Sequence, residues 1–199
     1  MVTLRGLDID GQGSGANGIF ISSAKAVHVE KCTIRNILGV PFSTGIVIPA
    51  VSTTIFLFVS DTVISGNKIG ILLHSSGGFK VASLKHVTIT GSGADGLQLF
   101  GANLYANVTE SIISGNAGSA ANAAFSGTTV NIDRSTIANN ATGLTATSGA
   151  IIRASGNNIY NNATGFSIGA GAFIQSDSTN NTGGSNGGLA GPNASLTKN

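Results

Sequence analysis

The sequence predicts an all-β fold, a single-stranded parallel β-helix of about seven to eight coils of about 22–30 residues each. Three observations indicate this fold. One isoleucine recurs at nearly even spacing, short alternations of apolar and polar residues flank it, and no 3.6-residue apolar period is present. Short alternating runs between Gly-rich and Asn-rich bends are typical of strands joined by tight turns, and the even spacing indicates that these strands stack as coils of a solenoid.

The recurring isoleucine defines the coil. Successive copies are separated by 25, 30, 25, 24, 24 and 22 residues, and they are Ile9, Ile34, Ile64, Ile89, Ile113, Ile137 and Ile159. Five positions and seven positions before each isoleucine stands another apolar or small residue. Because alternate residues of a strand point to the same face, these three columns are expected to face inward.

A second alternation follows in each coil and begins with glycine. Its clear copies are Gly18-Ile19-Phe20-Ile21, Gly45-Ile46-Val47-Ile48, Gly70-Ile71-Leu72-Leu73, Gly96-Leu97-Gln98-Leu99, Gly143-Leu144 and Gly165-Phe166-Ser167-Ile168. The fifth copy is expected in degraded form near residues 122–125. An asparagine stands three positions after the isoleucine in four coils, as Asn67, Asn116, Asn140 and Asn162. We expect these side chains to bond one another from coil to coil.

The composition excludes several classes of function. Charged residues make up 9% of the chain, against about 25% in ordinary domains, and the net charge is +2 without a basic cluster, so nucleic acid is not an expected partner. Cys32 is the only cysteine, which rules out an internal disulfide or a zinc cluster and predicts a buried core residue. The segment 8–11, Asp-Ile-Asp-Gly, lacks the further carboxylate of a calcium loop, so no metal or other cofactor is expected. The apolar run at residues 46–59 is broken by Pro49 and too short to cross a bilayer, so membrane insertion is not expected.

The ends and loops depart from the repeat. Residues 1–175 are expected to form the β-helix, and residues 176–199 a Gly-, Ser- and Asn-rich tail or a weak cap. Met1 begins inside a coil without a signal peptide, so we expect an uncapped first coil that is either a truncated end or a site of self-association through residues 2–7. The widest loops, at residues 49–54 and 75–79, are expected to overhang one side of the rod.

Charged residues gather at one position of the repeat. Three positions before the isoleucine stand Lys31, Asp61, His86, Glu110 and Arg134, and the position before that includes Arg5, Glu30, Lys85 and Asp133. In stacked coils these rows form neighbouring vertical strips at a corner between two strands. One interpretation is a ladder of exposed ion pairs, Lys31 with Asp61 and Glu110 with Arg134, each contributing about 0–1 kcal/mol.

A catalytic interpretation uses the same strip. Asp61 and Glu110 are two coils apart, or about 9–10 Å, with His86 between them. That separation is at the upper limit for the two carboxylates of an inverting glycosidase. Lys85 or Arg134 would instead act as the base of a lyase that attacks a uronate. A third interpretation is a ligand-binding strip without catalysis.

Two absences weaken the catalytic interpretation. Lyases that act on acidic sugars usually need calcium held by clustered carboxylates, and Asp61 and Glu110 are too far apart to chelate one ion. Aromatic platforms for sugar rings are expected to be scarce, because Tyr105 and Tyr160 are the only tyrosines and occupy different positions of the repeat.

Four segments carry a resemblance to a known group: VTLRGLDIDGQGSGANGIFI, AVHVEKCTI, LFVSDTVISGN and SGNNIYNNATG. They resemble bacterial right-handed parallel β-helix repeat proteins of the pectate-lyase-like superfamily, a group without an assigned activity. The resemblance covers the chain to about residue 181, and it implies right-handed coils and an extracellular or periplasmic location. Enzymes of the wider superfamily carry clustered Asp or Arg after the corner. This sequence has no matching cluster, so the resemblance transfers no catalytic residue.

The sequence therefore favours a non-catalytic, exported structural or surface-interaction module, with polysaccharide as the partner to test. The alternative is a polysaccharide lyase or glycoside hydrolase that acts on uronate-containing polymers. Its candidate catalytic residues are Asp61, Lys85, His86, Glu110 and Arg134.

Overall fold

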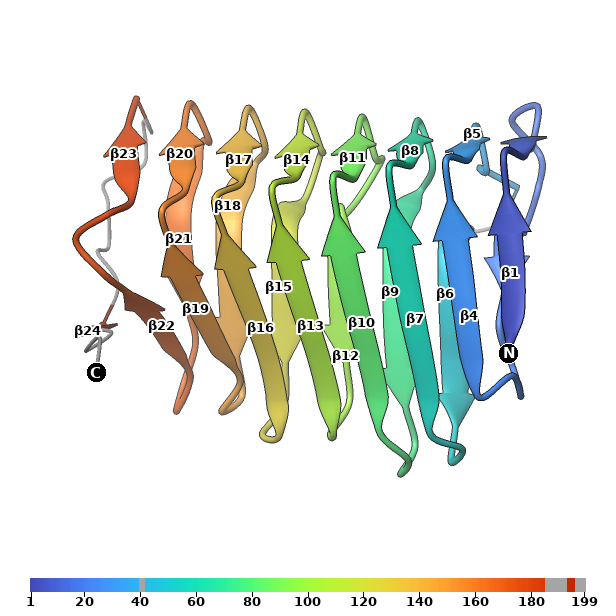
Figure 1. The fold of residues 1–199 in the computed structure, drawn as a ribbon. Helices are drawn as coiled ribbons and strands as arrows, with labels where there is room; N and C mark the ends of the chain where they lie inside the picture. The colour runs from blue at the N-terminus through green and yellow to red at the C-terminus, as the bar shows by residue number, and fades with distance from the viewer. Residues whose placement is uncertain (40–41, 185–192, 196–199) are drawn as a thin grey trace.

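The computed structural model describes residues 1–39, 42–184 and 193–195. In this part of the chain every regular element is a β-strand, and the strands stack coil upon coil into an elongated solenoid (Figure 1). Each coil contributes one strand to each of three sheets, called A, B and C here. The predicted all-β parallel β-helix is confirmed.

All neighbouring strands in the three sheets are parallel. Sheet A contains β1 (Val2–Arg5), β4 (Ala26–Glu30), β7 (Ile55–Ser60), β10 (Lys80–Lys85), β13 (Leu104–Thr109), β16 (Thr128–Asp133), β19 (Ile151–Ser155), β22 (Phe173–Ser176) and β24 (Ala194–Ser195). Sheet B contains β2 (Asp8–Asp10), β5 (Thr33–Arg35), β8 (Val63–Ser65), β11 (Thr88–Thr90), β14 (Ile112–Ser114), β17 (Thr136–Ala138), β20 (Asn158–Tyr160) and β23 (Asn181–Gly183). Sheet C contains β3 (Asn17–Phe20), β6 (Thr44–Val51), β9 (Ile69–Ser75), β12 (Leu97–Phe100), β15 (Ser119–Ala124), β18 (Thr142–Thr147) and β21 (Thr164–Ile168).

The strand register matches the repeat read from the sequence. The recurring isoleucines are paired from coil to coil along sheet B, from Ile9 to Ile159. The columns five and seven positions earlier are paired in the same way along sheet A. All three columns therefore line the interior, as predicted.

One detail of the predicted register is wrong. The fifth copy of the second alternation lies in β15, where Ala121 and Ala123 pair with Leu97 and Leu99. It begins at residue 120, two positions before the expected 122–125. Alanine replaces the larger aliphatic residues there, and Ala120 replaces the glycine, so the sequence pattern was too faint to locate.

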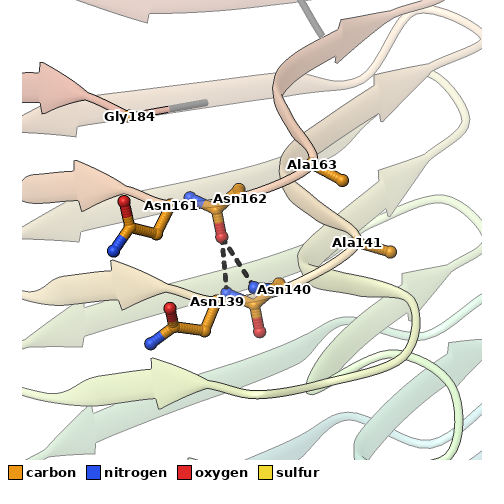
Figure 2. Close-up of a pocket in the computed structure, with 7 residues that line it drawn as sticks. All are labelled: Asn139, Asn140, Ala141, Asn161, Asn162, Ala163 and Gly184. Carbon is orange, nitrogen blue, oxygen red and sulfur yellow. Dashed lines mark hydrogen bonds between the residues drawn. The ribbon is translucent and has the colours of Figure 1, made fainter. Parts of the chain in front are cut away.

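A ladder of buried amides runs along the corner between sheets B and C. Asn140 Oδ1 accepts bonds from Asn116 N at 3.1 Å and from Asn116 Nδ2 at 2.8 Å. Asn140 N and Nδ2 in turn donate to Asn162 Oδ1, as Figure 2 shows. In an earlier coil, Asn67 Oδ1 accepts the main-chain N–H of Ile37 at 3.0 Å. The predicted asparagine ladder is confirmed.

A second ladder, which the sequence analysis missed, runs along the corner between sheets A and B. Asn157 Oδ1 accepts the main-chain N–H of Ser135 at 2.9 Å, and Asn180 Oδ1 accepts that of Asn157 at 2.9 Å. Earlier coils use a hydroxyl instead, because Ser111 N donates to Ser135 Oγ and Cys32 N donates to Thr62 Oγ1. The mixture of residue types concealed this column in the sequence.

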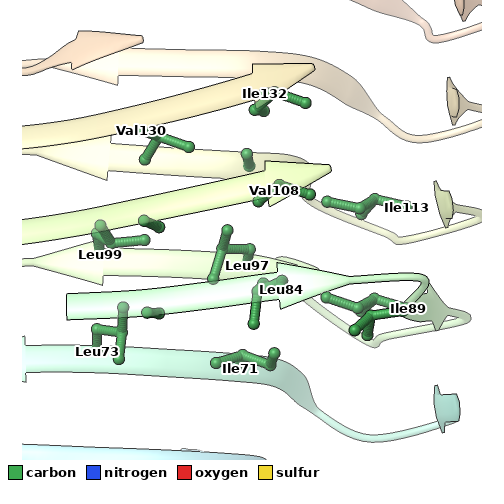
Figure 3. Close-up of a cluster of buried hydrophobic side chains, with 14 of the residues drawn as sticks. Ile71, Leu73, Leu84, Ile89, Leu97, Leu99, Val108, Ile113, Val130 and Ile132 are labelled. Atoms are coloured by element: carbon green, nitrogen blue, oxygen red, sulfur yellow. The ribbon is translucent and has the colours of Figure 1, made fainter. Parts of the chain in front are cut away.

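The core fills the space enclosed by the three sheets. Figure 3 shows side chains of facing strands, such as Leu84 of β10 and Leu97 of β12, pointing into this space. Both are almost fully buried, and the cluster extends along the rod from Ile19 to Ile174. Cys32 is buried and free, as expected. Burial of apolar area stabilises by roughly 25 cal/mol per Å², so this continuous core is the main source of stability.

Lys80 occupies an inward position of sheet A between two apolar residues. It pairs with Ile55 and Leu104 on the neighbouring coils, and its side chain is 0% exposed. Its Nζ donates to the carbonyl oxygens of Val51 at 2.8 Å, Thr53 at 2.5 Å and Gly78 at 3.2 Å. Burial lowers the pKa of Lys80. The lysine thus ties the end of β6 to the turns at residues 52–54 and 76–79, which are shorter than the expected loops at 49–54 and 75–79 because residues 49–51 continue β6 and Ser75 ends β9.

Part of the predicted tail continues the solenoid. Residues 181–183 form β23, which pairs with β20, and residues 194–195 form β24, which pairs with β22. Residues 185–192 and 196–199 lie outside the described residues. The division at residue 175 into a β-helix and a tail or weak cap stays a prediction.

Candidate functional site

The corner between sheets A and B holds the charged strip in a specific backbone conformation. Lys31, Asp61, His86, Glu110 and Arg134 all have positive φ, between 46° and 54°. This left-handed conformation is unfavourable for residues with a Cβ, and glycine occupies the position in the first and seventh coils. The turn projects the five side chains outward, and all five residues are exposed. The structure therefore brings the sequence-predicted candidates together on one edge.

His86 occupies the centre of this strip. Its Nδ1 lies 3.3 Å from Asp61 Oδ1, and its Nε2–H donates to Glu110 Oε2 at 2.7 Å. Lys85 Nζ lies 3.6 Å from Glu110 Oε2, and Arg134 lies 3.5 Å from Glu110 Oε1. The predicted Glu110–Arg134 pair is confirmed. Lys31 and Asp61 form no ion pair among the described residues, because Asp61 contacts His86 on the other side.

These contacts decide the electrostatics of Glu110. The hydrogen bond from His86 and the charge of Lys85 lower the pKa of Glu110, with a smaller contribution from Arg134. A glycosidase acid must instead hold its proton, which requires a raised pKa. His86 also fills the gap between Asp61 and Glu110, where an inverting enzyme needs room for a water molecule. The strip is therefore built as a self-neutralised charge network.

The second acidic segment is neutralised in a similar way. Arg35 of β5 bonds to Asp8 Oδ2 and to Asp10 Oδ2, both at 3.0 Å. The main-chain N–H of Gln12 and the side chains of Arg35 and Asn36 lower the pKa of Asp10. Within residues 1–39, 42–184 and 193–195, no three His, Cys, Asp or Glu side chains are grouped as metal ligands.

The outward face of sheet A carries two parallel columns of side chains, which we call the sheet A face. One column is mostly aromatic and aliphatic: Phe56, Val81, Tyr105, Thr129, Ile151 and Phe173. The next column is mostly polar: Phe58, Ser83, Asn107, Asn131, Arg153 and Gln175. Asn131 Nδ2 donates to Asn107 Oδ1 at 2.7 Å, and Arg153 Nε donates to Gln175 Oε1 at 2.8 Å. Polar and apolar groups thus lie side by side on successive coils.

Aromatic residues are more prominent on the surface than the sequence analysis expected. The ring of Phe79 stacks with that of Tyr105, with centroids 6.2 Å apart, and His28 stacks with Phe58 at 4.6 Å. The expectation of scarce aromatic platforms was wrong because it counted tyrosines and omitted phenylalanines. Their exposure becomes visible only when the inward and outward positions are known.

A concave surface lies on the outward side of sheet C. We call it the sheet C hollow, and it has a volume of about 440 Å³ and is lined by Phe42, Leu72, His74, Gln98 and Phe100. The second hollow lies at the corner of sheets B and C, has a volume of about 540 Å³ and is lined mainly by amides and alanines (Figure 2). Its outward Asn139 and Asn161 precede the buried ladder residues Asn140 and Asn162. The sequence analysis predicted neither hollow.

The fold and these surfaces define a class of protein, the parallel β-solenoids with a closed apolar core and exposed sheet faces. The family model described as "Right handed beta helix region" matches residues 44–195, and the chain belongs to this family. No curated protein and no solved structure matches the chain. Among the described residues there is no helix of the length and hydrophobicity that a membrane crossing requires.

Proposed function

We propose that this chain is a non-catalytic, exported surface-interaction module that binds a neutral polysaccharide along the sheet A face. The proposal rests on the pairing of the apolar and polar columns on that face, in register over six coils from β7 to β22. Aromatic rings pack against the apolar faces of sugar rings, while amides donate to and accept from hydroxyl groups. A sugar unit needs both kinds of contact.

The linear arrangement of the columns favours a polymer over a single sugar. Parallel strands are spaced by about 4.8 Å, so the columns repeat at this interval along the rod. A chain lying across the strands meets a similar pair of surfaces at every coil. Many weak contacts on one polymer add up to a useful affinity because each later contact is intramolecular.

The charges at the edge of the sheet A face favour a neutral polymer over a uronate, and Arg153, which lies on the face, donates its Nε–H to Gln175. Lys85, His86 and Arg134, at the edge of the sheet A face, are already engaged by carboxylates of the chain. A uronate carboxylate would have to displace these internal partners to gain an ion pair. Exposed pairs of this kind contribute little to affinity.

The alternative function, a lyase or glycoside hydrolase acting on uronates, has one observation in its favour. Asp61, His86 and Glu110 do converge at one corner, next to the proposed binding face. Against it stand the lowered pKa of Glu110 and the occupation of the space between the carboxylates. We therefore keep catalysis as the second candidate.

Affinity electrophoresis in gels that contain a neutral or a uronate-rich polysaccharide tests the binding proposal. The chain should be retarded more strongly by a neutral β-linked glucan or xylan than by a uronate polymer. Tyr105→Ala removes a central ring and should weaken binding roughly tenfold. Tyr160→Ala removes an equally exposed ring from sheet B and should leave binding unchanged. Equal losses in the two variants, or no retardation by any neutral polymer, would refute the proposal.

A product assay on the same polymers separates binding from catalysis. We expect neither unsaturated sugars, read by ultraviolet absorbance, nor new reducing ends. Product release that disappears in Asp61→Ala or Lys85→Ala would establish the enzyme instead.

Export is part of the proposal and is supported only by the resemblance of the sequence segments to exported β-helix proteins. Fractionation of cells that produce the natural protein, followed by immunodetection, tests it. Detection outside the cytoplasm is expected, and a purely cytoplasmic signal would contradict it.

A further inference from the structure

The sheet C hollow is separate from the proposed polysaccharide face, because it lies on a different sheet. Its floor comes from β9 and β12, where Leu72 pairs with Gln98 and His74 pairs with Phe100. Phe42, just before β6, adds a wall and is 77% exposed. The volume of about 440 Å³ lies within the range of about 300–1,000 Å³ typical of small-molecule sites.

One wall of the hollow, the ring of Phe100, is held in place by neighbouring rings. The Phe100 ring makes edge-to-face contacts with His74, at 5.3 Å between centroids, and with Phe125, at 4.8 Å. Phe100 is nevertheless 43% exposed. Phe100 and His74 line the hollow, and Phe125 supports Phe100 from outside it, so Phe100 offers a preformed surface to another planar ring. Such a surface loses little conformational freedom when a ligand binds.

Two polar groups accompany these rings. Neither the His74 imidazole nor the Gln98 carboxamide has a hydrogen-bond partner among the described residues. The two residues are diagonal neighbours on paired strands, so both can reach one ligand. Among the described residues that line the hollow there is no Asp, Glu, Lys or Arg, so none of these side chains balances a ligand charge.

We propose that the sheet C hollow binds a small, uncharged phenol, that is, one aromatic ring that carries a hydroxyl group. The ring packs against Phe42 and Phe100, and the hydroxyl exchanges hydrogen bonds with His74 or Gln98. A sugar fits less well because most of its hydroxyl groups would face phenylalanine and leucine without partners. A ring without a hydroxyl would leave both polar side chains unpaired.

Fluorine NMR with 4-fluorophenol as the probe tests this inference on the full chain. We expect saturable line broadening and a shift of the fluorine signal. Fluorobenzene, which lacks the hydroxyl, and 4-fluorocyclohexanol, which lacks the flat ring, should each bind roughly tenfold more weakly. Methyl glucoside should not displace the probe. Equal affinity for all three fluorinated compounds would refute a phenol site and indicate non-specific apolar contact.

Variants locate the site. Phe100→Ala should weaken the binding of 4-fluorophenol at least about tenfold, and Gln98→Ala about threefold to tenfold, with the circular dichroism spectrum unchanged. Tyr160→Ala is the matched control, because it removes an exposed ring of β20 in sheet B that does not line the hollow, and it should not alter the probe affinity. Unchanged probe binding in both hollow variants would place the phenol elsewhere and overturn the inference. The result is independent of polysaccharide binding, which Tyr105→Ala tests separately.

Discussion

Ser92 interrupts the buried asparagine ladder, and Ser92→Asn should complete the ladder and stabilise the protein. Residue 92 stands three positions after Ile89, in the column of Asn67, Asn116 and Asn140. Its side chain is 2% exposed, and its Oγ has no hydrogen-bond partner among the described residues. The hydroxyl is too short to reach the previous coil as the asparagines do.

The neighbouring coils define what an asparagine would gain at position 92. Each ladder amide accepts the main-chain N–H of the previous ladder position, as Asn116 does from Ser92 at 2.9 Å. Each amide except Asn116 also donates to the isoleucine carbonyl of the previous coil, as Asn162 does to Ile137 at 3.0 Å. Position 92 would therefore add bonds to Asn67 N and to Ile64 O. Gly70 lacks a Cβ, which leaves room for the amide in the way that Gly96 leaves room for Asn116.

The expected gain in the free energy of unfolding is about 1–2 kcal/mol. Two or three buried hydrogen bonds contribute about 0.5–1.5 kcal/mol each, and ordering the longer side chain costs about 1 kcal/mol. With a urea m-value near 2–3 kcal/mol/M, the midpoint should rise by about 0.5 M without a change in m. The assay is equilibrium urea unfolding followed by circular dichroism.

Ser92→Ala is the control for this prediction. It removes the unpaired hydroxyl without adding an amide, and its free energy of unfolding should stay within about 0.5 kcal/mol of that of the original protein. If alanine raised the midpoint as much as asparagine, removal of the hydroxyl would be the cause. A midpoint for Ser92→Asn at or below that of the original protein, with an unchanged β spectrum, would refute the ladder reasoning.

The other predictions concern Asn140 of the ladder, the buried Lys80 and Glu110 of the charged strip. Asn140→Ala leaves several buried ladder groups unpaired and should lower the free energy of unfolding by about 3 kcal/mol in the same urea assay. Asn139 is exposed, so Asn139→Gly should change the free energy of unfolding by less than about 1 kcal/mol. Lys80→Met leaves three carbonyl groups without their ammonium donor and should lower the free energy of unfolding by about 2–5 kcal/mol. Lys25→Met, at the surface, should leave the free energy of unfolding almost unchanged. Similar losses for both lysines would contradict the proposed role of Lys80. The folded-state pKa of Glu110 is lowered, so its stabilisation is complete above the usual glutamate pKa and is lost as the pH falls through the folded value. The stability difference between the original protein and Glu110→Gln should therefore be present at neutral pH and shrink in acid, and a difference that grows in acid would contradict the assignment.

The fold was predictable because its signal is repeated. A single strand of three to six residues is ambiguous, but seven copies of one isoleucine at intervals of 22 to 30 residues leave only a stacked architecture. The register failed at β15, where alanines replaced the aliphatic residues that carry the pattern. The second ladder was not predicted for a related reason. Threonine, serine and asparagine side chains all accept the main-chain N–H of the previous coil, so no single residue type marks this column.

The candidate surfaces were less predictable than the fold. The charged strip was found from the sequence because its residues share one repeat position, but the central role of His86 depends on side-chain directions at a left-handed corner. His74 and Phe100 share one repeat position, four residues after Gly70 and Gly96, but Phe42 lies outside the repeat, and the pattern does not show that these side chains form a hollow. Only the stacking of β9 beside β12 brings these rings together.

The sequence by itself determined the period, the inward columns and the position of the main asparagine ladder, because these depend on local alternation and on a repeat that is written into every coil. Tertiary structure alone decided that His86 links Asp61 to Glu110, how Lys80 is buried between apolar neighbours, and where exposed rings form a hollow. Those properties arise from contacts between residues about 22 to 30 positions apart on neighbouring coils, and their side-chain geometry is fixed only when the coils stack.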